Sequence, residues 1–145
     1  MDTNWTYAVE LRREEGGRIH AYAAAMPDAI ASGDDSVEAL REMALALDAA
    51  VRGRIRFGMD LEPPPADDGS SRHTVTLPVA LAAKAMLYVV WRQSGLTKVA
   101  LAKALGVHEK EARRVLDPDH PTGLDRLASA AQACGYRFTV GATRL

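Results

Sequence analysis

The chain has 145 residues, of which 48% are apolar and 26% charged, a composition typical of one ordinary globular domain or two small ones. No run of about 18 apolar residues is present, so a membrane span is not expected. The N-terminus lacks the basic and apolar regions of a signal peptide. Cys134 is the single cysteine and cannot form an intramolecular disulfide, which suits a reducing compartment. We therefore expect a cytoplasmic protein.

Charge is distributed unevenly along the chain. Residues 1–71 contain 7 Lys and Arg against 14 Asp and Glu, a net charge of −7. Residues 72–145 contain 11 against 5, a net charge of +6. This asymmetry favours a second half that contacts a polyanion and a first half that binds a basic partner. Attraction between the two halves is the alternative explanation.

The first elements expected are three strands. Apolar and polar residues alternate over residues 5–11, the pattern of a half-buried strand. Residues 14–17, Glu-Glu-Gly-Gly, indicate a hairpin turn, after which residues 18–24 return as a second strand. A Pro27-Asp28 loop precedes a short third strand at residues 29–32.

A helix follows these strands. Asp34, Asp35 and Ser36 are suited to cap its N-terminus, where acidic side chains are favourable. Its expected buried stripe, spaced by three and four residues, is Val37, Leu40, Ala44, Leu47 and Val51. With one more strand near residues 55–61, the first domain is predicted to be β-β-β-α-β and to span residues 1–61.

Residues 62–72 are acidic and contain three prolines, which indicates an extended linker before a second domain at residues 73–145. The elements expected in this second domain are a short strand at 74–77, helices at 78–93, 97–104, 108–116 and 123–134, and a final strand at 136–140. The fold class predicted for the whole chain is therefore α+β.

Residues 97–116 match the pattern of a helix-turn-helix. Ala102 is small enough for two helices to approach, Gly106 reverses the chain, and Val107 fills the angle between the helices. Ala112 and Val115 are expected to bury the inner face of the second helix. Thr97 and Lys98 are then expected to contact DNA phosphates. The side chains expected to face the major groove are those of His108, Glu109, Lys110, Glu111, Arg113 and Arg114.

A plain helical bundle with a solvated basic face is the alternative to this motif. Glu109 and Glu111 dilute the positive charge of the second helix. Acidic side chains nevertheless accept hydrogen bonds from cytosine amino groups or reject wrong bases, so they are compatible with DNA binding.

Several stretches of the chain resemble the HicB antitoxins that carry a helix-turn-helix. The C-terminal matches are residues 77–78, 101–107, 114–120, 124–127 and 135–138, and the N-terminal match is residues 26–40. The resemblance implies a truncated RNase H-like first domain that binds and blocks HicA, a small, basic, mRNA-cleaving toxin. It also implies a helix-turn-helix domain that dimerises, or forms a higher even-numbered oligomer, and represses the operon by binding operator DNA.

Two stretches depart from the family's pattern. Residues 29–31 replace a Leu-Pro-Gly-Cys-like stretch, which bears on the details of toxin contact. His108-Glu109 replaces Ser-Arg or Ser-Lys at the start of the recognition helix, which bears on the operator sequence. The residues expected to contact toxin are Pro27, Asp28, Asp34, Asp35 and His20.

Catalysis and metal binding are not expected. The carboxylates that a nuclease of this fold class would use with Mg²⁺ are Glu10, Asp28, Asp34, Asp35 and Asp48. Capping, turn and strand-surface roles account for most of them, and the four histidines show no zinc-site spacing. No cofactor is expected either. The rival hypothesis is a stand-alone transcription regulator whose N-terminal domain senses a ligand or partner, and an adjacent gene for a small basic protein would favour the antitoxin.

Overall fold

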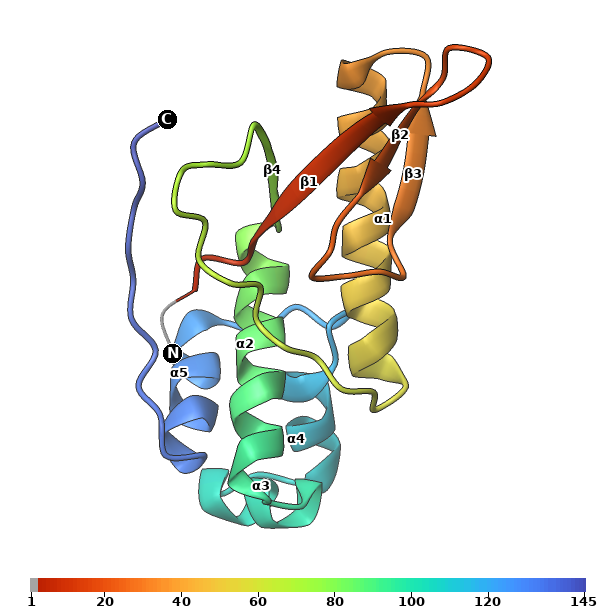
Figure 1. Ribbon diagram of the computed structural model, residues 1–145. Coiled ribbons are helices and arrows are strands. Elements are labelled where there is room, and N and C mark those ends of the chain that lie inside the picture. The colour runs from red at the N-terminus through yellow and green to blue at the C-terminus, as the bar shows by residue number, and fades with distance from the viewer. Residues whose placement is uncertain (1–2) are drawn as a thin grey trace. The chain divides into compact units, whose positions relative to one another are not determined.

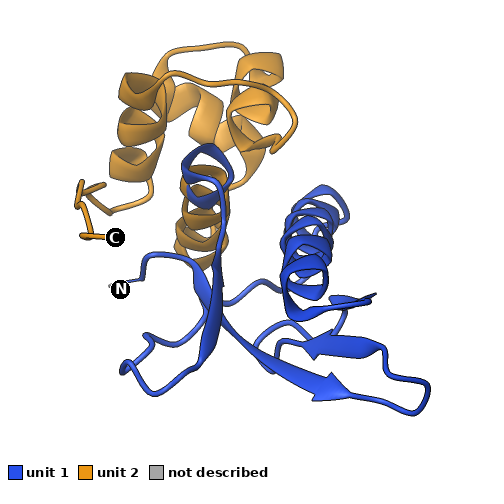
Figure 2. Ribbon diagram, turned by 90° about the horizontal axis from the view of Figure 1, so that it is seen from above, with its two compact units in different colours: residues 1–82 blue, residues 83–145 orange. Residues whose placement is uncertain are grey.

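The computed structural model describes residues 3–145, so Met1 and Asp2 of the N-terminal stretch lie outside the described residues. The chain forms two compact units, residues 1–82 and 83–145 (Figure 2). The elements are β1 (Thr6–Arg13), β2 (Ile19–Tyr22), β3 (Ile30–Gly33), α1 (Ser36–Arg56), β4 (His73–Thr76), α2 (Val79–Ser94), α3 (Lys98–Leu105), α4 (Glu109–Leu116) and α5 (Leu124–Ala133). Within the described residues, no helix is long and apolar enough to cross a bilayer.

The first unit is an antiparallel sheet in the order β3-β2-β1-β4, with α1 packed against one face (Figure 1). Tyr7 and Val9 of β1 and Ile19 and Ala21 of β2 are buried, whereas their neighbours along each strand are more exposed. This alternation confirms the predicted hairpin, whose turn contains Gly16 and Gly17 at positive φ. The predicted third strand is also confirmed, as β3.

Helix α1 begins with the predicted acidic cap. Oδ1 of Asp35 accepts a hydrogen bond from the backbone N of Glu38 at 2.8 Å, and Oε2 of Glu38 accepts one from the backbone N of Asp34 at 2.8 Å. The buried stripe consists of Ala39, Met43, Leu47, Val51 and Ile55. Of the predicted stripe, Leu47 and Val51 are buried, whereas Leu40 and Ala44 are only half-buried. The prediction of a buried Val37 is wrong, because this side chain lies in the first turn on the outer side and is 66% exposed.

The predicted strand at residues 55–61 is wrong. Ile55 is the last member of the buried helical stripe, and α1 continues to Arg56 before Gly58 reverses the backbone at φ 66°. The fourth strand of the sheet is instead β4, which pairs with β1 in the register Tyr7↔Val75. The short strand expected at the start of the second domain therefore belongs to the sheet of the first unit.

The second unit consists of helices packed around one apolar core. Its buried members are Leu87, Val90, Leu101, Ala102, Ala112, Val115, Leu116, Leu127, Ala130, Ala131 and Cys134. The four predicted helices are confirmed to within one or two residues as α2 to α5. Cys134 behaves as a small buried apolar residue, and its burial raises the pKa of the thiol.

The predicted final strand at residues 136–140 is absent from the described part of the chain. No neighbouring strand pairs with this segment there, so its alternating pattern has no ladder to join, and Val140 is 98% exposed. The segment follows α5, and Phe138 is partly buried against the core of the second unit. Near its start, the Tyr136 hydroxyl donates to Oε1 of Gln93 at 2.8 Å.

Candidate functional site

A three-residue turn joins α3 and α4 in the second unit. Gly106 takes the left-handed conformation at φ 67° and ψ 34°, and its N–H donates to Lys103 O at 3.1 Å. The N–H of Val107 donates to Ala102 O at 3.0 Å. Ala102 and Ala112 are both buried, and their small side chains allow the two helices to pack closely. The turn thus presents α4 at a fixed angle to α3.

The N-terminus of α3 lies at the surface. The Thr97 hydroxyl caps this helix by accepting a hydrogen bond from Ala100 N at 3.0 Å. The Lys98 ammonium lies 5.9 Å from the centroid of the Trp91 ring, and both Thr97 and Lys98 are exposed. A hydroxyl, an ammonium and the positive end of a helix therefore occur together, a combination that suits an anion.

The surface of α4 carries charges that largely pair with one another. Nη2 of Arg113 donates to Oε1 of Glu109 at 2.5 Å, and Nη1 of Arg114 donates to Oε1 of Glu111 at 2.5 Å. Lys110 is exposed. His108, the N-cap residue, is also exposed and forms no side-chain capping hydrogen bond. The outer face of α4 therefore offers both donors and acceptors at one surface.

Lys84 of α2 anchors the C-terminal end of α4. This side chain is buried, and its ammonium donates to Arg114 O at 3.0 Å, to Val115 O at 2.7 Å and to Oγ1 of Thr122 at 2.6 Å. Burial lowers the pKa of Lys84 from 10.5 to about 8, and the charge of Asp117 acts in the opposite direction. Two carbonyls in the last turn of α4 thereby accept hydrogen bonds from a side chain of another helix, and Arg114 O also accepts one from Asp117 N at 3.2 Å.

The three aspartates predicted to contact a partner already have partners inside the first unit. Oδ2 of Asp28 pairs with Nη2 of Arg54 at 2.7 Å, Oδ1 of Asp34 pairs with Nη1 of Arg18 at 2.8 Å, and Asp35 caps α1. Arg54 lies near the C-terminal end of α1, whereas Asp34 and Asp35 lie at its start. At about 1.5 Å per residue, roughly 28 Å of helix separates Asp35 from Arg54, so Asp28 does not form one patch with Asp34 and Asp35.

Pro27 and His20, the other predicted contact residues, lie on a loop and on a strand, respectively. Pro27 is exposed in the loop between β2 and β3. His20 is half-buried on β2 and stacks on Tyr22 with a centroid separation of 6.5 Å. The Arg12 guanidinium covers the same Tyr22 ring at 4.7 Å. His20 thus belongs to an aromatic and cationic surface on one face of the sheet.

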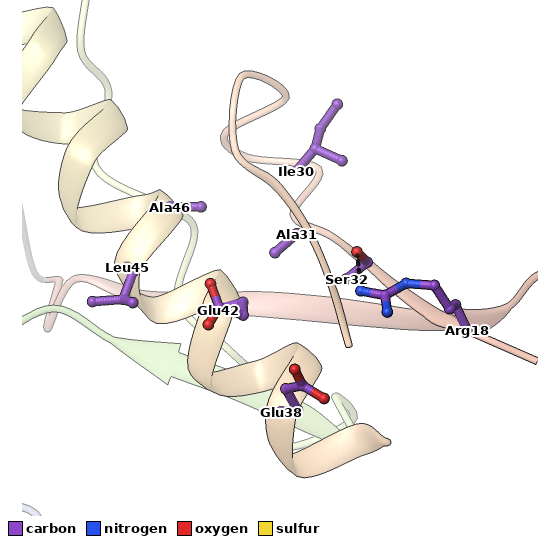
Figure 3. Close-up of a pocket in the computed structure, with 8 residues that line it drawn as sticks. All are labelled: Arg18, Ile30, Ala31, Ser32, Glu38, Glu42, Leu45 and Ala46. Atoms are coloured by element: carbon purple, nitrogen blue, oxygen red, sulfur yellow. Dashed lines mark hydrogen bonds between the residues drawn. The ribbon is translucent and has the colours of Figure 1, made fainter. Parts of the chain in front are cut away.

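A shallow hollow lies between the outer edge of β3 and α1, and Figure 3 shows its side chains. It is lined by Arg18, Ile30, Ala31, Ser32, Glu38, Glu42, Leu45 and Ala46, and we name these residues the β3-edge hollow. Ile30 and Leu45 are each 62% exposed. Arg18 is held at its rim by Asp34 and by the Ser32 hydroxyl, to which its Nη2 donates at 3.1 Å.

The carboxylates considered for catalysis are not gathered into one site. Glu10 pairs with Arg12 at 2.9 Å, and Asp48 pairs with Arg52 at 2.6 Å. The ion pair with Arg12 holds the pKa of Glu10 below its usual range. Within residues 3–145, no group of three or more His, Cys, Asp or Glu side chains is arranged to hold a metal ion.

Comparison with known proteins shows to which family this chain belongs. The chain is 30% identical over 137 residues to antitoxin HicB 1 of Photorhabdus laumondii, covering 94% of this chain and 86% of that protein. It is 30% identical over 128 residues to antitoxin HicB of Escherichia coli K12, covering 87% of this chain and 90% of that protein. The chain belongs to the HicB antitoxin family. The resemblance inferred from the sequence is therefore confirmed, although no protein-family model matches the chain.

Two features of this HicB-family chain were not found from its sequence. The buried Lys84 lies in an apolar helical stretch. The feature of the sequence that could have indicated its burial is a single lysine among the apolar residues Leu81, Ala85 and Leu87. The β3-edge hollow combines Arg18 with residues of β3 and α1 that are not contiguous in sequence. The sequence indicates this hollow even less clearly, because residue type alone does not show whether an isoleucine in a strand, such as Ile30, is exposed or buried.

Proposed function

We propose that the second unit binds operator DNA through a helix-turn-helix formed by α3 and α4, with α4 as the recognition helix. The observation that carries this proposal is the tight turn at Gly106, which packs α3 on α4 through Ala102 and Ala112. The polar side chains of α4 remain at the surface, as base recognition requires. The N-terminus of α3 supplies Thr97 and Lys98 for phosphate contacts.

The ion pairs on α4 bear on how it would recognise DNA. Arg113 and Arg114 are each held by a glutamate one turn away, so a base or phosphate must compete with that carboxylate. Both pairs are surface pairs, which are worth at most about 1 kcal/mol. Exchange of partner on binding is therefore inexpensive, while Glu109 and Glu111 repel phosphates placed in a wrong register. His108 and Lys110 complete the proposed base-reading set.

We also propose that the first unit is a truncated RNase H-like domain and that it binds and neutralises a HicA-type mRNA-cleaving toxin. Its sequence carries the negative charge of the chain, with −7 over residues 1–71, and a cationic partner would be steered toward it. Membership of the HicB family supports a toxin as that partner. Asp28, Asp34 and Asp35, with Pro27 and His20, remain the proposed contacts.

A homodimer, or a higher even-numbered oligomer, is proposed for the DNA-bound form. A single eight-residue recognition helix with mixed charge reads few base pairs, and a second copy supplies a second half-site. Sedimentation of the full chain at micromolar concentration tests this point. A monomer under these conditions would contradict the proposal.

The toxin proposal is tested with the small basic protein expected from the neighbouring gene. The full chain should bind this protein, rescue cells that express it, and associate more slowly at high salt. Reversing Asp34 and Asp28 to Lys should slow association at low salt, whereas an unchanged rate would place the interface elsewhere. Failure of the unaltered chain to bind or rescue would favour the rival stand-alone regulator.

A further inference from the structure

The outer edge of β3 is an unpaired strand edge. β3 is the end strand of the sheet, and β2 is its only hydrogen-bonded neighbour among the described residues. The strand contains Ile30, Ala31, Ser32 and Gly33, without the charge or proline that commonly protects an edge from pairing. Its outward backbone groups are therefore available to a further strand.

The space beside this edge is bordered by exposed apolar side chains. Ile30 from the strand and Leu45 from α1 are each 62% exposed, and Ala46 lies beside Leu45 on the helix (Figure 3). A single exposed apolar residue needs no explanation, but two that border one hollow along a free strand edge indicate an interaction surface. A strand added to β3 would place an apolar side chain between them.

The charge of the β3-edge hollow indicates which kind of polypeptide segment can bind there. Glu38 and Glu42 line the helix side, and Glu42 is exposed with no ion pair among the described side chains. The cation of the hollow, Arg18, is already paired with Asp34 at 2.8 Å. An occupant with Lys or Arg side chains therefore fits, whereas a second copy of this acidic unit would bring like charges together.

We propose that the β3-edge hollow receives an extended, basic segment of the toxin, which adds to β3 as a fifth strand and inserts an apolar side chain between Ile30 and Leu45. Backbone hydrogen bonds would supply affinity, and the hollow with Glu42 would supply specificity. This inference rests on the proposed function, and it adds to the proposed contacts the side of the sheet where β3 and the middle of α1 meet.

Matched substitutions in the full chain test this proposal. Leu45→Lys and Glu42→Lys alter the hollow, and the controls Phe57→Lys and Glu62→Lys make the same chemical changes at exposed positions outside it. The binding partner is the small basic protein that we expect a neighbouring gene to encode. We expect each hollow variant to bind it at least about 10-fold more weakly and each control to stay within about 2-fold of the unaltered chain.

The outcomes separate this inference from the proposed function. If the unaltered chain binds and the hollow variants bind equally well, the inference is wrong while the toxin proposal stands. Equal losses in the controls would assign the effect to net charge and would also overturn the inference. If the unaltered chain does not bind, the proposed function itself fails.

Amide hydrogen exchange of the unaltered chain gives a second test that requires no substitution. Addition of a strand to β3 should slow exchange within residues 30–33 when the basic protein binds, because outward N–H groups gain acceptors. Slowed exchange confined to other segments, with none at residues 30–33, would overturn the proposal.

Discussion

Replacing Lys84 by Met should destabilise the second unit by about 2 kcal/mol. Lys84 is 4% exposed and donates three hydrogen bonds, two of them to the backbone carbonyls of Arg114 and Val115 at the end of α4. Methionine has a similar length and shape, so it fills the same space without a cavity. The substitution therefore isolates the loss of the ammonium.

The magnitude follows from two opposing contributions. A hydrogen bond from a charged donor contributes about 1.5–3 kcal/mol, and a buried acceptor left without a partner costs about 1–3 kcal/mol. Burial of the ammonium itself costs free energy, as the lowered pKa of Lys84 shows, and Met removes this cost. The difference leaves a net loss of about 2 kcal/mol, concentrated at the C-terminal end of α4.

Urea unfolding of the full chain measures the loss, and amide hydrogen exchange assigns it to one unit. Exchange should accelerate in α4 and remain unchanged in α1. Lys103→Met is the matched control, because Lys103 is exposed on α3, and it should change stability by less than about 0.5 kcal/mol. A Lys84→Met protein as stable as this control would refute the anchoring role derived from the structure.

Two further predictions concern stability. Gly33→Ala should lower the melting temperature, because a Cβ at this position would lie 2.5 Å from the backbone N of Ala39. A Cβ at Gly53 inside α1 would meet nothing within 4 Å, so Gly53→Ala should stabilise the protein by about 0.5–1 kcal/mol. Equal effects of the two substitutions in thermal unfolding would contradict this prediction. The pKa of Lys84 is about 8 in the folded state against 10.5 unfolded, so the unfolded state binds more protons between these values. The free energy of unfolding should therefore rise between pH 8 and 9.5 relative to Lys84→Met, and a flat difference in urea titrations would count against it.

Local patterns predicted most of the helices and strands of this chain. Alternation along β1 and β2, the acidic cap of α1 and the small residues around Gly106 are all set by neighbours within a few positions. These features depend on backbone geometry and local hydrogen bonds, which the residue order largely determines.

The errors in strand assignment occurred where structure depends on partners distant in sequence. β4 joins β1 across about 70 positions, and nothing in the sequence around Val75 indicates which strand it pairs with. The segment at residues 136–140 has the residue pattern of a strand but no neighbouring strand among the described residues. Ile55 fits both a strand and the buried stripe of α1, whose members are spaced four residues apart. In each case tertiary packing decided between local possibilities.

The candidate site was only partly predictable for the same reason. The outward residues of α4 follow from helical periodicity, but their ion pairs depend on rotamers that the sequence does not specify. The partners of Asp28 and Asp34 lie 26 and 16 residues away, respectively, so their engagement with Arg54 and Arg18 was not visible.

The central claim is that DNA binding and toxin neutralisation belong to different units. The direct test combines two assays on the double variant Arg113→Ala and Arg114→Ala, since this change removes two donors from α4 and leaves buried Ala112 and Val115 in place. Removing one base-specific interaction should cost about 1–3 kcal/mol, and removing one phosphate interaction should lower the salt slope by about 1. The matched control replaces two exposed arginines beyond the helices, Arg137 and Arg144, by Ala.

The measurement is binding to DNA from upstream of the chain's own gene at several salt concentrations, together with rescue of cells that express the small basic protein expected from the neighbouring gene. We predict that the double variant loses DNA binding at physiological salt, that the control keeps it, and that both still rescue the cells. Unchanged DNA binding by the double variant would mean that α4 is not the recognition helix, and loss of rescue by a folded variant would contradict the division of labour between the two units.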